Sequence, residues 1–111
     1  MRLLSWNCQE LGNPWTGQNF RKIVKEQAPT VCFLMETKLD KDGFKNLYGN
    51  FPYQNKIIVK HPNSGGGLAL LWKNSITLEV INYTVNHVLV VVTEKDGFKW
   101  FLTCFCRWPE A

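Results

Sequence analysis

The first part of the chain contains two short segments rich in apolar residues, at 2–8 and 30–36, and the second of them is continuously apolar from Val31 to Met35. Runs of this length are typical of strands that are covered on both faces. Between them, apolar side chains recur at helical spacing at Phe20, Ile23 and Val24. The pattern therefore predicts a strand, a helix and a second strand, joined by a right-handed crossover that makes the two strands parallel.

The limits of this helix are marked by residues that favour helix ends. Asn13, which precedes Pro14, or alternatively Thr16, is suited to cap its start, and Pro29 ends it. A second, shorter helix is expected before residue 49, with Gly43 as its weak point, followed by a turn over residues 49–52.

Beyond residue 55 the pattern changes to short segments rich in β-branched and aromatic residues, which are typical of strands. The predicted strands are residues 56–60, 67–72, 76–82, 88–93 and 98–106. Asp96-Gly97 is a strong signal for a hairpin turn between the last two strands. No internal repeat or linker interrupts the series, so the sequence predicts one α/β domain over residues 1–111.

Composition supports a single small globular domain without a membrane segment. The 111 residues are 45% hydrophobic and 20% charged, which argues against disorder. The longest apolar runs fall far short of the ~20 residues that span a bilayer, and the N-terminus lacks the pattern of a secretory signal. We therefore expect an intracellular protein whose four cysteines are free thiols, with Cys104-x-Cys106 as buried apolar residues rather than metal ligands.

The net charge of +4 is compatible with a polyanionic partner but does not require one. The densest basic group is Arg21, Lys22 and Lys25, which we interpret as a solvated helix face, with phosphate contact as the less favoured alternative. His61 and His87 have no neighbouring carboxylate in the sequence, so structural roles are expected for both.

Asn7 and Glu36 each stand at the end of a predicted buried strand. Because parallel strands end at the same edge of a sheet, these residues should lie side by side, where α/β proteins usually bind ligands. A carboxylate and an amide suit a hard cation such as Mg²⁺, which also keeps water and substrate phosphate as ligands. From spacing alone, a solvated carboxylate and a turn asparagine remain the more frequent explanation.

Three segments, read together, resemble the endonuclease/exonuclease/phosphatase superfamily. They are Leu4-Ser-Trp-Asn-Cys-Gln9, Phe33-Leu-Met-Glu-Thr-Lys-Leu39 and Ser64-Gly-Gly-Gly-Leu-Ala-Leu-Leu-Trp-Lys73. The resemblance is closest to the apurinic-like endonuclease domain of plant non-LTR retrotransposons and extends through Leu102–Glu110. It implies a four-layered α/β sandwich that hydrolyses phosphodiester bonds of DNA with Mg²⁺ or Mn²⁺, with Glu36 binding the metal and Asn7 positioning metal and phosphate.

The sequence departs from the family pattern at several places. Gln9 stands where some relatives have Asp, Glu10 where Gly is usual, and Cys106 where the pattern usually has Tyr. The family's Asp-x-Asn and Ser-Asp-His motifs occur nowhere in the 111 residues. The resemblance therefore implies the N-terminal portion of the sandwich, incomplete and marginally stable alone.

Three functional hypotheses follow. The first is a truncated endonuclease with little or no turnover and weak metal binding, and the resemblance alone places it in the nucleus. The second is a catalytically inactive module that binds DNA or a protein partner. The third is a degenerate retroelement product without a selected role. In each case the uncovered sheet favours self-association.

Overall fold

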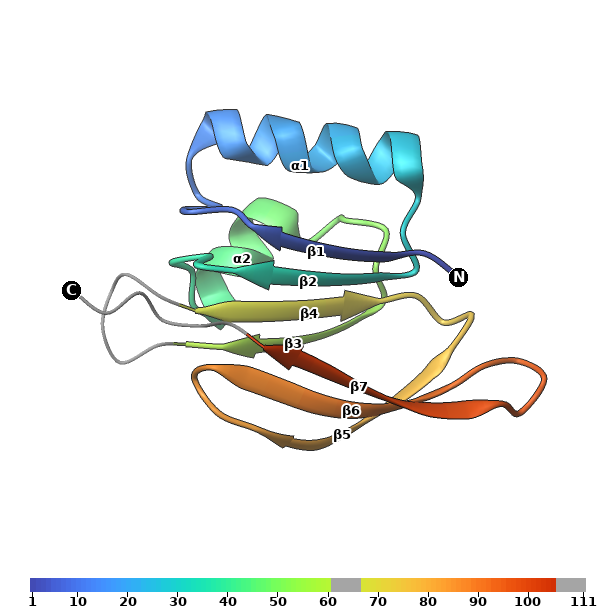
Figure 1. Cartoon of the computed structure of the whole chain (residues 1–111). Helices are drawn as coiled ribbons and strands as arrows, with labels where there is room; N and C mark the ends of the chain where they lie inside the picture. The colour runs from blue at the N-terminus through green and yellow to red at the C-terminus, as the bar shows by residue number, and fades with distance from the viewer. Residues whose placement is uncertain (61–66, 106–111) are drawn as a thin grey trace.

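The computed structural model describes residues 1–60 and 67–105 (Figure 1). Strands and helices alternate at first and strands follow one another later. In chain order they are β1 (Leu3–Asn7), α1 (Pro14–Gln27), β2 (Val31–Met35), α2 (Lys41–Tyr48), β3 (Asn55–Val59), β4 (Leu68–Trp72), β5 (Thr77–Tyr83), β6 (His87–Thr93) and β7 (Lys99–Phe105). Each predicted helix and strand is present, with ends that differ by a residue or two from the sequence-based limits.

The predicted β1–α1–β2 unit is confirmed, with its two strands parallel and Leu3 paired in register with Val31. Of the two candidate caps, Asn13 begins α1, because its side chain accepts a hydrogen bond from the backbone N–H of Trp15 at 2.9 Å. At the other end Ala28 adopts a left-handed conformation, and Pro29 follows as expected.

Gly43, the predicted weak point of the second helix, lies in the first turn of α2. Its backbone N–H donates a 2.7 Å hydrogen bond to the side chain of Asp40, which caps the helix. The glycine thus lies in the first turn, where an unpaired N–H needs a partner, and not in the helix centre.

The strands form two sheets. The first has the order β1-β2-β4-β3, and the second is the antiparallel series β5-β6-β7. The predicted hairpin between β6 and β7 is present, with Gly97 at a φ of 90° and Phe98 N–H donating to the Asp96 carboxylate at 2.9 Å.

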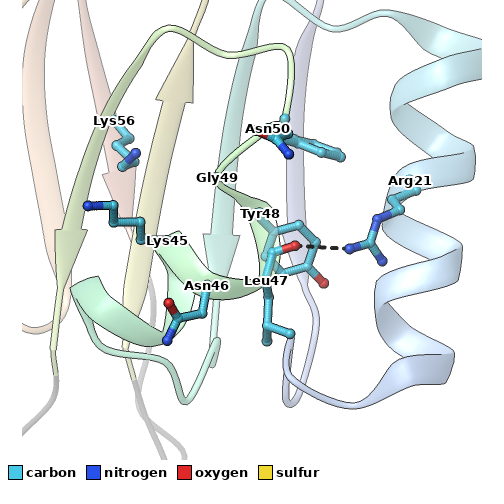
Figure 2. Close-up of a pocket in the computed structure, with 9 residues that line it drawn as sticks. Arg21, Lys45, Asn46, Leu47, Tyr48, Gly49, Asn50 and Lys56 are labelled. Atoms are coloured by element: carbon cyan, nitrogen blue, oxygen red, sulfur yellow. Dashed lines mark hydrogen bonds between the residues drawn. The ribbon is translucent and has the colours of Figure 1, made fainter.

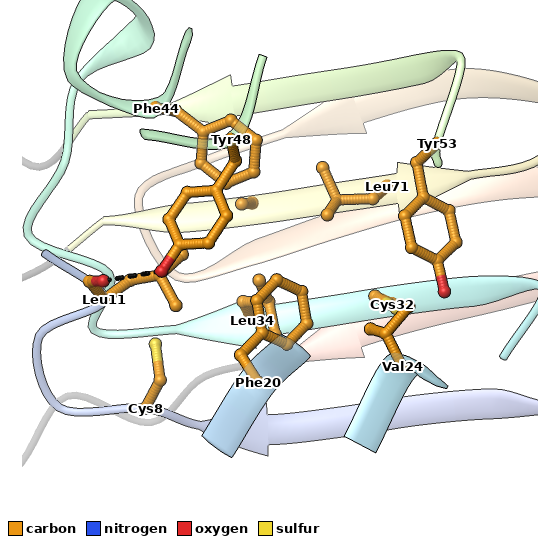
Figure 3. Packing of buried hydrophobic residues seen from close by; sticks show 11 residues of the cluster. Cys8, Leu11, Phe20, Val24, Cys32, Leu34, Phe44, Tyr48, Tyr53 and Leu71 are labelled. Carbon is orange, nitrogen blue, oxygen red and sulfur yellow. Dashed lines mark hydrogen bonds between the residues drawn. The ribbon is translucent and has the colours of Figure 1, made fainter. Parts of the chain in front are cut away.

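The first sheet is covered on both faces at β2 and β4, which explains their continuous apolar runs. β1 is not the buried strand that the sequence predicted, because its residues alternate between exposed and half-buried positions at the edge of the sheet. One face packs against the two helices, with Phe20, Leu34 and Tyr48 at the centre of this cluster (Figure 3). The other face packs against the second sheet, with Phe33, Leu70 and Val90 in contact. Buried thiols contribute to both clusters, and Cys8, Cys32 and Cys104 are free as expected, whereas Cys106 lies outside the described residues.

The result is a three-layer arrangement of helices, sheet and sheet (Figure 1). In the described part of the chain no helix covers the outer face of the second sheet, where Phe101 is 73% exposed and Phe105 is 65% exposed. Across residues 1–60 and 67–105, neither helix is long and apolar enough to cross a membrane.

Candidate functional site

The C-terminal ends of β1 and β2 lie next to each other, as the sequence predicted. Asn7 is paired in register with Met35, and the Cys8 N–H donates to the carbonyl of Met35 at 3.1 Å. Glu36 directly follows Met35. The backbones that carry Asn7 and Glu36 therefore meet at one edge of the sheet, which we call the rim.

The rim extends to the start of β4 through two backbone hydrogen bonds. The Leu11 N–H donates to the Thr37 carbonyl at 3.0 Å, and the Thr37 N–H donates to the Gly67 carbonyl at 3.3 Å. Thr37 is completely buried. These backbone hydrogen bonds join the segment after β1 to the segment after β2, and the segment after β2 to the start of β4. They therefore fix the positions of the backbones at the rim.

Backbone strain is concentrated at the rim. Among the described residues other than glycine, five have a positive φ, and four of these follow β1 or β2: Gln9 (56°), Glu10 (146°), Glu36 (52°) and Lys38 (53°). Such conformations cost of order 1–3 kcal/mol each and cluster at ligand-binding and catalytic sites. Glu10 occupies the position where the resemblance led us to expect glycine, and its φ of 146° is a conformation that glycine adopts without this cost.

The polar groups of the rim are accessible. The Asn7 side chain is exposed, and its carbonyl oxygen accepts a 3.2 Å hydrogen bond from the Gln9 N–H. Glu36 is half-buried. Burial raises the pKa of the neighbouring Cys8 thiol to about 11, and the negative charge of Glu36 contributes in the same direction.

The donor set of the rim fits a hard divalent cation that keeps most of its water. Within residues 1–60 and 67–105, no three His, Cys, Asp or Glu side chains gather as a protein-only metal cage would require. Mg²⁺ commonly uses one or two carboxylates, with water and substrate phosphate completing its shell. The Glu36 carboxylate and the amide oxygen of Asn7 are oxygen donors of this kind, and their backbones stand at the same edge of the sheet.

Histidine takes no part in the described rim. The His87 Nε2 lies 2.8 Å from the Asn82 side-chain oxygen, and its Nδ1 lies 2.8 Å from the Thr84 hydroxyl. Both ring nitrogens therefore stabilise the turn between β5 and β6, which agrees with the structural role predicted from the sequence. His61 and the glycine-rich segment 64–66 lie outside the described residues.

One arrangement of basic residues could not be predicted from the sequence. The sequence groups Arg21 with Lys22 and Lys25 on α1, whereas the structure places it with Lys45 and Lys56 around one pocket. These residues come from α1, α2 and β3, so no local pattern could have grouped them.

Comparison with solved structures shows the same fold in proteins of low sequence identity. The catalytic domain of human Nocturnin has a TM-score of 0.64 at 16% identity, and the match covers 93% of this chain and 48% of that one. The AP endonuclease LMAP from Leishmania major has a TM-score of 0.65 at 15% identity, with coverages of 93% and 39%. The APE2 catalytic domain of Xenopus laevis has a TM-score of 0.61 at 17% identity, with coverages of 93% and 43%.

The chain thus spans less than half the length of these three structures. No curated protein matches it. A family model described as the Endonuclease/Exonuclease/phosphatase family matches residues 4–105, which is most of the 111-residue chain. The chain therefore belongs to the Endonuclease/Exonuclease/phosphatase family.

Proposed function

We propose that this chain is part of a divalent-metal-dependent phosphodiesterase that acts on DNA, with Asn7 and Glu36 in its metal and phosphate site. The observation that carries the proposal is that these two residues stand at one strained edge of the sheet: Asn7 is paired in register with Met35, and Glu36 is the next residue after Met35. Two similar solved structures point to DNA: an AP endonuclease and a Neisseria 3' phosphatase bound to a product DNA hairpin.

In this proposal Glu36 would hold Mg²⁺ or Mn²⁺ through its carboxylate, and Asn7 would orient a phosphate oxygen or a water ligand through its amide. The cation supplies electrostatic stabilisation of charge on the phosphoryl and leaving oxygens when it is bound. The backbone N–H of Gln9 donates a hydrogen bond to the side-chain oxygen (Oδ1) of Asn7. This bond orients the Asn7 side-chain amide and therefore its NH₂ group. Within the family, the motifs around both residues favour the retrotransposon-type endonucleases, and a nuclear location follows from that resemblance.

Turnover by this chain alone is expected to be slow. The printed sequence has no Asp-x-Asn or Ser-Asp-His motif, and the described rim contains no histidine that could act as a general base. Positioning of the nucleophile and general-base catalysis each increase the rate of hydrolysis by factors of roughly 10² to 10⁴. We therefore propose that residues 1–111 by themselves bind metal and DNA more readily than they hydrolyse a phosphodiester bond.

The test combines cation binding with cleavage. Titration with Mn²⁺, followed by electron paramagnetic resonance, should show one bound ion whose affinity falls at least roughly tenfold in Glu36→Gln. Glu79→Gln is the matched control, because Glu79 is an exposed carboxylate on β5. Any nicking of supercoiled plasmid should disappear with EDTA and in Glu36→Gln. Equal Mn²⁺ affinity in the wild type and Glu36→Gln would refute the proposed site.

A non-catalytic binding role is the second candidate, favoured by the three cationic side chains, Arg21, Lys45 and Lys56, that line one pocket. Salt-dependent DNA binding with no Mn²⁺ binding at the rim would support it over the metal-dependent function.

We also propose that the chain self-associates through the outer face of the second sheet, because Phe101 and Phe105 expose most of their surface there.

A further inference from the structure

A pocket of about 610 Å³ lies between α1 and the C-terminal end of α2, away from the residues of the rim (Figure 2). Three cationic side chains from different elements line it: Arg21 of α1, Lys45 of α2 and Lys56 of β3. Its other lining residues in the described chain include no acidic side chain. The pocket therefore concentrates positive charge from three directions.

Arg21 is held in position by the end of α2. Its Nη2 donates a 3.1 Å hydrogen bond to the Leu47 carbonyl, and its Cζ lies 4.8 Å from the centre of the Tyr48 ring. Figure 2 shows the guanidinium directed from α1 toward this helix end. A guanidinium has five N–H donors, so one bond to a carbonyl leaves donors for an anion, and a side chain already held in place loses little further entropy on binding.

The negative end of the α2 helix dipole needs only part of this positive charge to be neutralised. The exposed carbonyls at the C-terminus of a helix are equivalent to roughly half a negative charge. Arg21, with its bond to Leu47, already offsets that amount. Lys45 and Lys56 add two further positive charges to the same pocket, so its net potential is positive.

A second pocket continues the first toward the rim. It has a volume of about 280 Å³ and shares Arg21, Leu47 and Tyr48 with the larger pocket. Its remaining lining comes from the loop that follows β1, at Leu11 to Asn13, and from the start of α1, at Pro14, Gly17 and Gln18. The two pockets are thus adjacent, and we call them together the basic groove. Three cations spread over neighbouring pockets suit a chain of phosphates better than a single small anion.

We propose that the basic groove binds the sugar–phosphate backbone of a DNA strand at a subsite distinct from the phosphodiester held at the rim. The choice of DNA rests on the proposed function, whereas the position and charge of the subsite rest on the groove itself. A strand that lies against Arg21 and continues past the Leu11–Pro14 loop would approach the end of β1.

The experiment measures binding of a short fluorescent DNA duplex to the whole chain by anisotropy, at several salt concentrations and without divalent metal. The variant Lys45→Gln/Lys56→Gln should weaken binding roughly five- to tenfold and reduce the slope of log affinity against log salt by about one to two. Lys22→Gln/Lys25→Gln is the control, since it removes two charges from α1 outside the groove lining. Arg21→Lys keeps the positive charge but removes the planar guanidinium with its paired N–H donors, so this variant should also bind the duplex more weakly.

Competition with inorganic phosphate and with a mononucleotide separates a backbone subsite from a site for free phosphate. Displacement of the duplex only at high concentrations of either competitor supports the backbone subsite, whereas displacement at low concentrations overturns it. Equal weakening in the control double variant, or unchanged binding in Lys45→Gln/Lys56→Gln with native circular dichroism, also overturns the proposal. Absence of Mn²⁺ binding in the wild type, with DNA binding at the groove retained, would refute the proposed metal site and leave the groove standing.

Discussion

The hydroxyl of Tyr48 donates a 2.9 Å hydrogen bond to the backbone carbonyl of Leu11 (Figure 3). This bond joins the C-terminal end of α2 to the loop after β1. Leu11 in turn donates its N–H to Thr37, the residue after Glu36. One buried side chain therefore supports both the rim and the wall of the basic groove.

Replacing Tyr48 by Phe should lower the free energy of unfolding by about 1–2 kcal/mol, because a buried carbonyl loses its partner while the ring packing is kept. Urea denaturation followed by circular dichroism measures this loss. Tyr53→Phe is the matched control, since Tyr53 donates a comparable buried bond to the Pro29 carbonyl at 2.7 Å. Amide exchange at Leu11 should accelerate more in Tyr48→Phe than in Tyr53→Phe, and equal exchange would show that Tyr48 does not support the rim.

Gly67 should not tolerate a side chain. Its φ is 109°, and an added Cβ would lie 2.8 Å from the Thr37 hydroxyl oxygen. Gly97 has a similar φ of 90° but open space around it. Gly97→Ala should therefore cost about 1–2 kcal/mol of unfolding free energy through backbone strain alone, and Gly67→Ala more, because steric overlap adds to it. Equal midpoints in chemical denaturation of the two variants would contradict the close packing of Gly67 against Thr37.

The stability of the protein should fall as the pH rises above about 9. Burial raises the pKa of the Cys104 thiol from 9.0 to about 11. The folded state then keeps a proton that the unfolded state loses, so this stabilisation is complete below pH 9 and disappears as the pH approaches 11. Two pKa units correspond to at most roughly 2–3 kcal/mol.

The variant Cys104→Ala isolates this contribution. Removing the sulfur should cost a similar amount of stability at every pH through lost packing, but the fall in unfolding free energy between neutral pH and pH 10.5 should be smaller than in the wild type. Tyrosine and lysine residues also titrate in this range, so the difference between the two proteins is the quantity to compare. An identical pH dependence of both would argue against a buried neutral thiol.

The sequence predicted the elements well because their signals are local. Asn13-Pro14 specifies the start of α1, and the continuous runs of β2 and β4 follow from burial on both faces of the sheet. The meeting of Asn7 and Glu36 at one edge could also be predicted, since a β–α–β unit constrains its strands to be parallel.

What the sequence could not predict depends on contacts between distant segments. The left-handed conformation of Glu36 has no signal in its residue type, because such a φ is imposed by the surrounding hydrogen bonds rather than favoured locally. The grouping of Arg21 with Lys45 and Lys56 similarly depends on how α1, α2 and β3 pack, and the nearest basic neighbours of Arg21 in the sequence are different residues.

Self-association can be tested at the outer face of the second sheet. Phe101 on β7 is 73% exposed and is paired in register with Val91, so the two side chains lie together on that uncovered face. Sedimentation velocity should show a mass that increases with protein concentration, and Phe101→Lys should shift it toward the monomer, because burying a charge against an apolar face is costly. Trp15→Lys is the matched control, since Trp15 is an equally exposed aromatic residue (72%) on α1. If Trp15→Lys reduced association as much as Phe101→Lys, or if the wild type stayed monomeric at all concentrations, the outer face of the second sheet would not be the contact surface.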